Sequence, residues 1–300
     1  MTFLSQILQG VFLGAYYALI ACGLSFLFGV MRIINLAHGS IAVLSGYLVL
    51  TIAEHFGISP FLALLAAVPV MAAAGFVLQR TIFERSLRSG PLIPLLSTFG
   101  LAVVLDNAMF QSFGANTRSL APDIGDLSFS GWSGPGGIQV GQLAVLTLLV
   151  SVVLLGGLQL FLNRTPLGRA IRACAEDPET AELVGIDARN VYAAATAIAL
   201  VTVAIAGTFL GMRATFDPYT GQTQLIFAFE AVVIGGAGSL WGTLIGGIAL
   251  GVAQNLGSQV SPQGFLIGGH ILFLGVLAAR FLLGGRDWRT LAGMRKRVPA

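Results

Sequence analysis

The sequence predicts an all-α, polytopic integral membrane protein, and three observations carry this prediction. Hydrophobic residues make up 56% of the chain and charged residues only 10%, whereas soluble domains carry about 25% charged residues. Apolar runs of about 20 residues, the length of a membrane-spanning helix, recur along the chain. The 39 glycines suit a membrane bundle, because small residues let membrane helices approach closely. We therefore expect residues 1–300 to form a single transmembrane domain with about 8–10 spans.

Seven apolar runs are long enough to cross a bilayer by themselves. In chain order they are Ile7–Val30, Ile33–Ala53, Pro60–Gln79, Leu92–Phe113, Val140–Leu162, Val191–Met212 and Gly264–Leu283. Two shorter pieces, Gln224–Gly236 and Leu240–Leu256, are shortened or interrupted by glycine, which predicts broken or re-entrant helices near 224–256. The first run is too long for a signal-peptide core and follows no basic segment, so no cleavable signal peptide is expected.

The basic residues predict the orientation, because Lys and Arg are enriched in cytoplasmic loops. If the N-terminus is outside and all nine pieces cross, every basic residue except Arg118 and Arg213 lies on the inner side. If Gln224–Gly236 only dips into the membrane, the basic C-terminus falls outside. We therefore expect nine crossings with a cytoplasmic C-terminus. The outer loop Gly114–Gly141 is rich in Gly, Ser and Pro and predicts turns or a small hairpin, either as a connector or as an external docking surface.

Residues 163–190 form a polar island between two spans. The island holds four of the sixteen basic residues and five of the thirteen acidic residues. One explanation is an amphipathic helix that rests on the membrane surface. Mixed charge counts against that explanation, because interfacial helices favour Lys and Arg on their polar face. The pattern instead predicts an ordered, charged element on the inner side, of the kind that docks onto a partner.

Capping signals divide the island into two short helices. The first helix is expected to begin at the Pro-Leu-Gly tripeptide 166–168 and to run to about Glu176. Asp177 is placed to cap the second helix, with Pro178 at its first position. Glu179 complements the helix dipole in the first turn, and Gly185 is placed to end the helix. One side of the element is expected to be apolar, formed by Ile171, Leu183, Val184 and Ile186.

The island resembles a known transporter segment. The matching stretches are Asn163-Arg164-Thr165-Pro166-Leu167-Gly168-Arg169-Ala170-Ile171-Arg172-Ala173, Asp177-Pro178-Glu179-Thr180-Ala181 and Val184-Gly185-Ile186-Asp187. They are similar to the cytoplasmic segment of the branched-chain amino acid ABC transporter permeases, which docks into a groove on the ATPase subunit. The resemblance implies that the island couples ATP hydrolysis to movement of the spans. It assigns this role to Leu167, Gly168, Arg169, Ile171, Arg172, Asp177, Glu179, Glu182 and Gly185.

Three further stretches resemble the same family in the same order, namely Gly10–Gly46, Pro91–Arg118 and Glu230–Gly247. Residues 280–285 depart from the family's usual ending. The resemblance implies a permease subunit of a binding-protein-dependent importer for branched-chain or related amino acids, in a bacterial plasma (inner) membrane. Its expected partners are two ATPase subunits, a second homologous permease or a second copy, an external solute-binding protein and the lipid bilayer.

The chain contains no Gly-x-x-x-x-Gly-Lys-Ser/Thr sequence, so ATP is expected to be hydrolysed by partner subunits. We expect no bound cofactor, no metal site and no enzymatic activity of the chain itself. The spacing His-Glu-x-x-His is absent, and no nucleophile–base pair is visible. The basic residues are segregated by loop rather than gathered in one patch, which argues against nucleic-acid binding.

Polar residues inside spans are candidates for the translocation path, because such residues are costly in lipid and often functional. The candidates are Asn35, His38, Asp106, Asn107 and Glu230. His38 is alternatively a packing histidine bonded to a carbonyl. Asp106 alternatively forms a structural hydrogen bond, for example with Asn107, and Glu230 alternatively holds the glycine-rich turn after it by accepting backbone N–H bonds.

The spans offer no full set of charged residues to hold a zwitterion, which is consistent with solute selection by the external protein. Urea, short amides and small carboxylates are alternative solutes within the same class of permease. A transporter of another class, driven by an ion gradient through Asp106, Glu230 and His38, is the alternative mechanism. It differs in predicting uptake without ATP.

Overall fold

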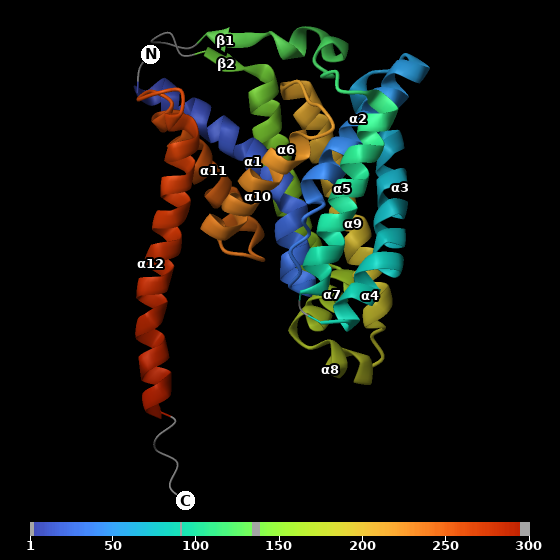
Figure 1. Cartoon of the computed structure of the whole chain (residues 1–300), viewed down its shortest axis with the longest axis vertical. Helices are drawn as coiled ribbons and strands as arrows, with labels where there is room; N and C mark the ends of the chain where they lie inside the picture. Colours follow the sequence, from blue (N-terminus) through green and yellow to red (C-terminus); the bar gives the residue numbers. More distant parts are fainter. Residues whose placement is uncertain (1–2, 91, 134–138, 295–300) are drawn as a thin grey trace, which may run out of the picture.

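The computed structural model describes residues 3–90, 92–133 and 139–294. Pro91, the turn signal 135–137 and the basic residues 295–297 lie outside these ranges. The described residues form a helical bundle, which confirms the predicted fold class (Figure 1). Its elements are α1 (Phe3–Met31), α2 (His38–Phe56), α3 (Pro60–Leu78), the π-helix η1 (Gln79–Phe83), α4 (Glu84–Arg88), α5 (Ile93–Phe113), the 3₁₀ helix η2 (Pro122–Ser128), β1 (Gly131–Ser133), β2 (Gln139–Gly141), α6 (Gln142–Arg164), α7 (Pro166–Glu176), α8 (Pro178–Leu183), α9 (Ala188–Arg213), α10 (Thr220–Gly235), α11 (Leu240–Gly257) and α12 (Gly264–Met294).

Among the described residues, seven helices are long and apolar enough to cross a membrane, and an eighth span is counted if α10 and α11 form one broken span. These two helices meet at an angle of 116°, so the predicted break near 224–256 is confirmed. Glycine makes the sharp turn possible. Gly236 and Gly238 adopt left-handed φ values of 99° and 85°, and a Cβ on Gly235 would lie 2.0 Å from the carbonyl oxygen of Gly242.

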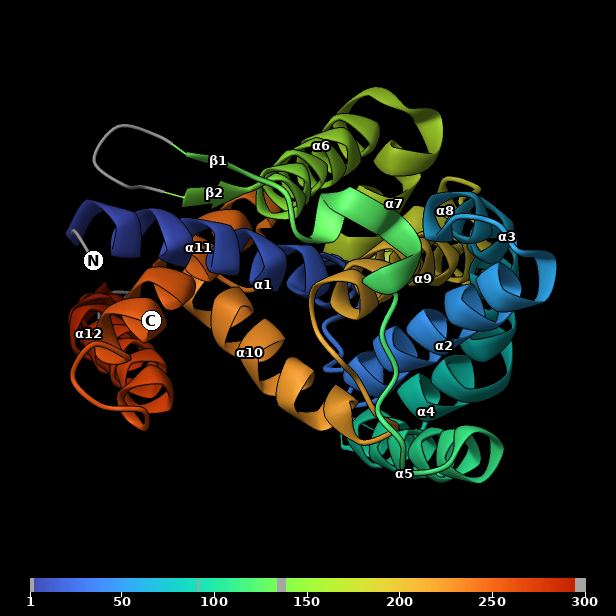
Figure 2. The same ribbon diagram turned by 90° about the horizontal axis from the view of Figure 1, so that it is seen from above.

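Helix α1 occupies the centre of the bundle and packs against α6, α9, α10 and α11 (Figure 2). It runs antiparallel to α11. Gly10 of α1 lies against Val252 of α11, and Gly29 near the other end of α1 lies against Gly238, in the turn just before α11. Helix α11 lies along most of the length of α1. The bent pair formed by α10 and α11 therefore extends across the bundle about as far as α1 does. In contrast, α12 lies at the periphery, and only 6% of the most apolar 18-residue stretch of this helix is buried.

The two faces of the bundle carry different elements. Figure 1 shows the start of α1 and the hairpin at one end, with α7, α8 and the end of α12 at the other. The start of α1 and the end of α12 thus lie at opposite ends of the bundle, as the nine-crossing prediction requires. Strands β1 and β2 pair antiparallel, with Trp132 opposite Val140, so the predicted hairpin is confirmed.

Several helix boundaries differ from the predicted spans; α12, for example, continues beyond the predicted end at Leu283 to Met294. The second span begins at His38 rather than at Ile33, because residues 32–37 are not helical and Arg32 has a positive φ of 54°. The third span does not end at Gln79 but continues through η1 into α4. Apolarity alone marks the membrane-embedded length, whereas the helix continues wherever its backbone hydrogen bonds do.

Candidate functional site

The polar island folds into the two capped helices that the sequence predicts. The carboxylate of Asp177 accepts hydrogen bonds from the backbone N–H groups of Glu179 and Thr180, each at 3.1 Å. Gly185 ends α8 with a φ of 86°, and the N–H of Ile186 donates to the carbonyl of Ala181. These bonds satisfy groups that a short helix would otherwise leave unpaired.

A further cap opens the first helix. The hydroxyl of Thr165 accepts a hydrogen bond of 2.9 Å from the N–H of Gly168, and Pro166 occupies the first position of α7. Sequence reasoning missed the role of Thr165, although Thr followed by Pro is a recognised start signal. The island is thus anchored at both helix starts.

The base of the island is packed into the bundle. Gly168, Ile171 and Cys174 are buried on α7, and Ile171 belongs to an apolar cluster with residues of α1 and α6, including Phe26 and Leu158. A Cβ on Gly168 would lie 2.4 Å from the carbonyl oxygen of Phe161, so α7 folds directly against the end of α6. Helix α7 is therefore packed directly against spans α1 and α6.

The outer surface of the island is only partly as predicted. Ile171 is buried as expected, but Leu183 and Val184 are 87% and 74% exposed, so they do not join one apolar side with it. Their placement at the end of the short helix α8 turns them away from the bundle. Leu167 is also exposed, at 37%. The structure thus presents an apolar tip, Leu183–Val184, that has no cover from the described residues.

The island also carries exposed charged side chains. Arg169, Arg172, Asp177, Glu179 and Glu182 are all exposed. Arg172 donates a hydrogen bond of 2.7 Å to the side chain of Asn163 at the end of α6. The sequence-predicted coupling residues therefore divide into a buried base, formed by Gly168 and Ile171, and an exposed charged surface. Exposed charge around an apolar centre is the usual anatomy of a protein interface.

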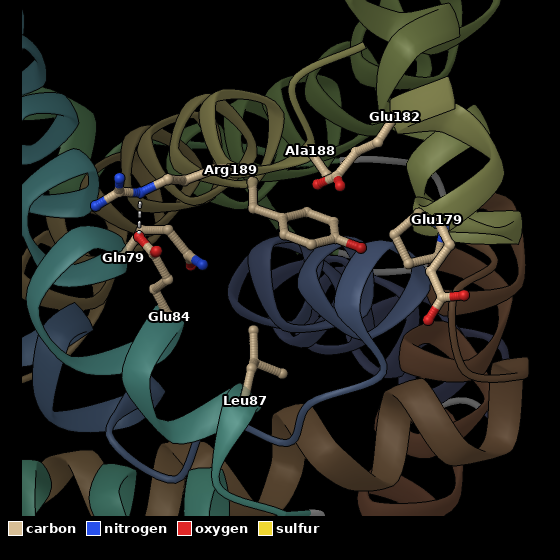
Figure 3. A pocket seen from close by; sticks show the side chains of 9 residues that line it. Gln79, Glu84, Leu87, Glu179, Glu182, Ala188 and Arg189 are labelled. Carbon is tan, nitrogen blue, oxygen red and sulfur yellow. Dashed lines mark hydrogen bonds and ion pairs between the residues drawn. The ribbon is translucent and has the colours of Figure 1, made fainter. Parts of the chain in front are cut away.

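A pocket of about 440 Å³ separates α8 from α4 (Figure 3). Its wall includes Glu84 of α4 and Arg189 of α9, which form an ion pair at 2.8 Å. Arg80 pairs with the same carboxylate at 3.8 Å and also bonds the side chain of Asn190. The full lining is Gln79, Glu84, Leu87, Pro178, Glu179, Glu182, Ala188, Arg189 and Tyr192.

These interactions connect the island laterally. The start of α9 is held to the end of the third span by the Arg189–Glu84 pair, and Tyr192 donates to the carbonyl of Cys174 at 3.1 Å. The island is therefore linked to α4 and α9 as well as to α1 and α6. Sequence reasoning did not identify Glu84 or Arg189 as partners, because they lie on separate helices.

Two titratable groups of the island have shifted pKa values. Hydrogen bonds from the side chain and the backbone of Thr180 hold the pKa of Asp177 below its usual value. Burial raises the pKa of the Cys174 thiol, and the negative charges of Glu182 and Asp187 add to this rise. Cys174 is only 1% exposed, so it is a poor target for thiol reagents.

The predicted path residue Asn35 lies in the linker between α1 and α2, and His38 is the first residue of α2. Asn35 is fully buried, and its side-chain oxygen accepts from the N–H of Ala37 at 3.0 Å. The Nε2 atom of His38 lies 2.8 Å from the carbonyl oxygen of Ile20. The side-chain geometry of His38 thus matches the packing alternative, and its backbone N–H donates to the carbonyl of Asn35 at 3.2 Å.

Asp106 and Asn107, on α5, have different surroundings. Asp106 is 2% exposed, and its Oδ2 atom lies 3.5 Å from the amide nitrogen of Gln222 on α10. The proposed bond from Asn107 is not formed. Instead, the exposed Asn107 donates to the carbonyl of Val103, one turn earlier in its own helix. Consecutive residues on a helix point in directions about 100° apart, which separates the two side chains.

Glu230 does not hold the glycine-rich turn. It is 3% exposed and pairs with Nδ1 of His270 on α12 at 2.5 Å. One turn further along α10, the carbonyl of Ile234 accepts a hydrogen bond of 3.0 Å from Arg280, also on α12. Sequence reasoning missed Gln222, His270 and Arg280. Their polarity inside or near a span was a signal, but their partners depend on how helices pack.

No group of three or more His, Cys, Asp or Glu residues that could hold a metal ion occurs in the described ranges 3–90, 92–133 and 139–294. Cys22 and Cys174 are both buried and both free. Within the described ranges, the candidate functional groups are therefore of two kinds. Some are polar side chains paired inside the bundle, and the others belong to the charged island at its end.

Comparison with known proteins gives consistent results. The family model described as "Branched-chain amino acid transport system / permease component" matches residues 6–280. The chain is 34% identical to the high-affinity branched-chain amino acid transport system permease protein BraD of Pseudomonas aeruginosa, over 86% of this chain and 87% of BraD. It is 32% identical to the corresponding protein LivH of Escherichia coli K12, over 85% and 86%.

A second type of relative also matches. The permease protein LivM of Escherichia coli K12 is 26% identical over 86% of this chain and 65% of LivM. The identity to BraD and LivH is higher and covers more of those proteins. The family model matches residues 6–280 of the 300-residue chain. This chain therefore belongs to the family of branched-chain amino acid transport system permease components.

Proposed function

We propose that this protein is the membrane-spanning permease subunit of an ABC importer for branched-chain amino acids. The observation that carries the proposal is the folded island α7–α8, whose base is packed into α1 and α6 and whose apolar tip is exposed. Membership of the permease family and similarity to BraD and LivH support the transport role and the solute class.

The island is the coupling element in this proposal. Leu183 and Val184 insert into a groove of the ATPase, and the surrounding charges set the orientation of docking. When the ATPases close, the island moves as one body because both of its helices are capped. The motion passes through Ile171 to α1 and α6, and through the Arg189–Glu84 pair to α4.

The remaining subunits follow from the same proposal. ATP is bound and hydrolysed by two partner ATPases, since the chain has no P-loop sequence of its own. Similarity to both LivH and LivM supports a second, homologous permease at its side. An external binding protein delivers the solute to the hairpin end, and the island end faces the cytoplasm of a cell whose inner membrane holds the complex.

Transport by the reconstituted complex tests this function. Proteoliposomes that contain the permeases and ATPases, with binding protein added, are expected to take up leucine only when ATP is present on the side of the island. Leucine uptake driven by an ion gradient without ATP would favour the secondary-transporter alternative. ATP-dependent uptake of urea or a short amide, without uptake of leucine, would redirect the proposal to another solute.

The docking role of the tip is tested by Leu183→Asp. A charge at the centre of an apolar contact is expected to cost about 2 kcal/mol, which lowers the affinity for the ATPase about 30-fold. Val260→Asp is the matched control, because Val260 is 88% exposed and lies in the segment that joins α11 to α12, at the end of the bundle opposite the island (Figure 1). Co-purification with the ATPase and uptake measure the effect. Equal behaviour of the two variants would contradict docking through Leu183.

The charged surface is tested by the double variant Arg169→Glu with Glu179→Arg. Both side chains are exposed, so the membrane bundle is expected to fold normally while ATPase docking is impaired. Size-exclusion chromatography of the isolated permease checks its folding. Normal complex assembly together with normal uptake would show that these charges take no part in coupling.

A further inference from the structure

Two groups of opposite charge lie where α10 and α12 face each other, one on each helix. Glu230 lies on α10, and Arg280 of α12 donates to the carbonyl of Ile234 at 3.0 Å. Ile234 follows Glu230 by four residues, which is about 6 Å along a helix axis. The tertiary structure thus places the guanidinium of Arg280 at a backbone carbonyl about one helical turn beyond the carboxylate-bearing Glu230.

The carboxylate of Glu230 is only half satisfied. Its Oε1 atom is paired with His270, whereas Oε2 is buried and has no hydrogen-bond partner among the described residues. A buried, unpaired carboxylate oxygen is costly and calls for a donor. The side chain that covers Glu230 is itself 47% exposed, so a single imidazole separates the carboxylate from whatever occupies this face.

Arg280 offers the complementary chemistry. It lies within the apolar span of α12 and is exposed. A guanidinium carries five N–H donors, of which the bond to Ile234 uses one. No ion pair to Arg280 is formed within the described part of the chain. A charged group in a span normally faces a partner or a water-filled path rather than lipid.

An apolar pocket lies beside α10, and its lining includes Phe229, next to Glu230 in the sequence, and Val233, one turn further along the helix. It has a volume of about 160 Å³ and is lined by Leu24, Phe28, Ile34, Phe229, Val232, Val233 and Ala237. That volume equals about five liquid water molecules, which is room for a branched side chain of three or four carbons. Phe229 joins the pocket to the charged side, because its ring packs against Phe273 of α12 at a centroid distance of 6.4 Å.

We propose that Glu230, Arg280 and this pocket form a transient binding station for one aliphatic α-amino acid on its way through the membrane. The ammonium group of the solute donates to Oε2 of Glu230, and its carboxylate accepts from the guanidinium of Arg280. The side chain enters the pocket beside Val233. His270 acts as a positioning residue that holds the other oxygen of Glu230. This station rests on the proposed function and adds a selectivity step within the permease itself.

Removal of either charge tests the station in the reconstituted complex. Glu230→Gln and Arg280→Gln are each expected to lower leucine uptake about tenfold or more, because each removes a charge-assisted hydrogen bond. Stimulation of ATP hydrolysis by the binding protein is expected to persist, and Arg280→Lys is expected to recover part of the uptake. Glu54→Gln and Arg118→Gln are the matched controls, since both side chains are exposed away from the station.

The pocket is tested separately by Val233→Phe, which fills the space that the solute side chain would use. Uptake of leucine is expected to fall more than uptake of the smaller valine, so that their ratio drops about tenfold. Equal losses for the two amino acids would overturn the assignment of the pocket.

Direct binding separates the station from the proposed function. Saturation-transfer NMR with the purified complex and leucine, without binding protein or ATP, is expected to give methyl signals that are lost in Glu230→Gln. Absence of these signals in the wild type overturns the station even if ATP-driven uptake is normal. Wild-type uptake that is matched within about twofold by both charge variants overturns it too. Failure of the wild type to import leucine counts against the proposed function, while the NMR result still decides the station.

Discussion

At the scale of single residues, Asp177 shows how one carboxylate organises the island. Its side chain caps α8 through two backbone N–H groups and also accepts from the hydroxyl of Thr180 at 2.6 Å. These bonds favour the charged form, so the pKa of Asp177 is lower in the folded protein than in the unfolded chain. The cap thus contributes stability above the unfolded pKa of about 3.9 and loses it as the pH falls through the lower folded pKa.

We expect Asp177→Ala to increase amide hydrogen exchange in residues 178–183 at pH 7, because the caps of Glu179 and Thr180 are lost. Asp177→Asn is expected to keep most of the protection, since Asn is also a good capping residue. Below pH 4, after correction for intrinsic exchange, protection in the wild type should fall while that in Asp177→Asn stays constant. Exchange measured by mass spectrometry would contradict the capping role if Asp177→Ala matched the wild type.

Other single residues acquire a role only through a distant partner. Asp106 and Glu230 are both buried acids, and both leave one oxygen without a partner among the described residues. Asp106 meets the neutral amide of Gln222, whereas Glu230 meets the imidazole of His270. The two acids therefore differ in chemistry although their sequence surroundings look alike. Only Glu230 has both a titratable partner and a neighbouring arginine.

At the scale of elements, the close packing of α1 on α11 depends on glycine. A Cβ on Gly14 would lie 2.3 Å from both the carbonyl oxygen of Gly247 and the Cα of Ile248. Such distances are far below van der Waals contact, and the clash is with backbone that cannot rotate away. This contact sets the position of α11, and through the turn at 236–239 it also sets the direction of α10.

We expect Gly14→Ala to destabilise the protein by about 1–3 kcal/mol, the usual cost of overpacking. Gly157→Ala on α6 is the matched control, because a Cβ there meets no atom within 4 Å, and it is expected to be neutral or slightly stabilising. Thermal unfolding of the purified permease in detergent measures both. A transition temperature of Gly14→Ala equal to that of the control would refute the close approach of the two backbones.

At the scale of the whole molecule, the bundle has two distinct ends. The hairpin lies at one end and the island at the other, with α12 ending on the island side (Figure 1). This separation agrees with the segregation of basic residues in the sequence. The assignment of the island end to the cytoplasm rests on that charge pattern.

Cysteine labelling tests the orientation. In a chain with Cys22→Ala and Cys174→Ala, we expect Val260→Cys to react with an impermeant maleimide added outside intact cells. Leu183→Cys should react only after the inner face is opened. Both positions are more than 80% exposed, so access rather than burial decides the result. The native Cys174 would be a poor probe because it is buried. The reverse labelling pattern would invert the topology.

The amino-acid sequence by itself determined the features that depend on neighbours in the chain. Apolar runs mark the spans, Asp177 and Pro178 mark the start of α8, and Gly185 marks its end. Each of these signals acts within a few residues, through transfer into lipid or through local backbone hydrogen bonds. The order of family-like stretches also indicated the transport class before any contact was known.

Only the tertiary structure decided which polar groups meet. Glu230 was expected either in the path or at the turn, yet it pairs with His270 on another helix. Leu183 was expected to share one apolar side with Ile171, yet Ile171 is buried and Leu183 is exposed at the tip. Such contacts depend on the crossing angles and depths of helices, which are set by glycine-mediated backbone approach and not by any local signal. For this reason the sequence indicated the transport class, whereas the packing of α10 against α12 suggested the solute station that we propose.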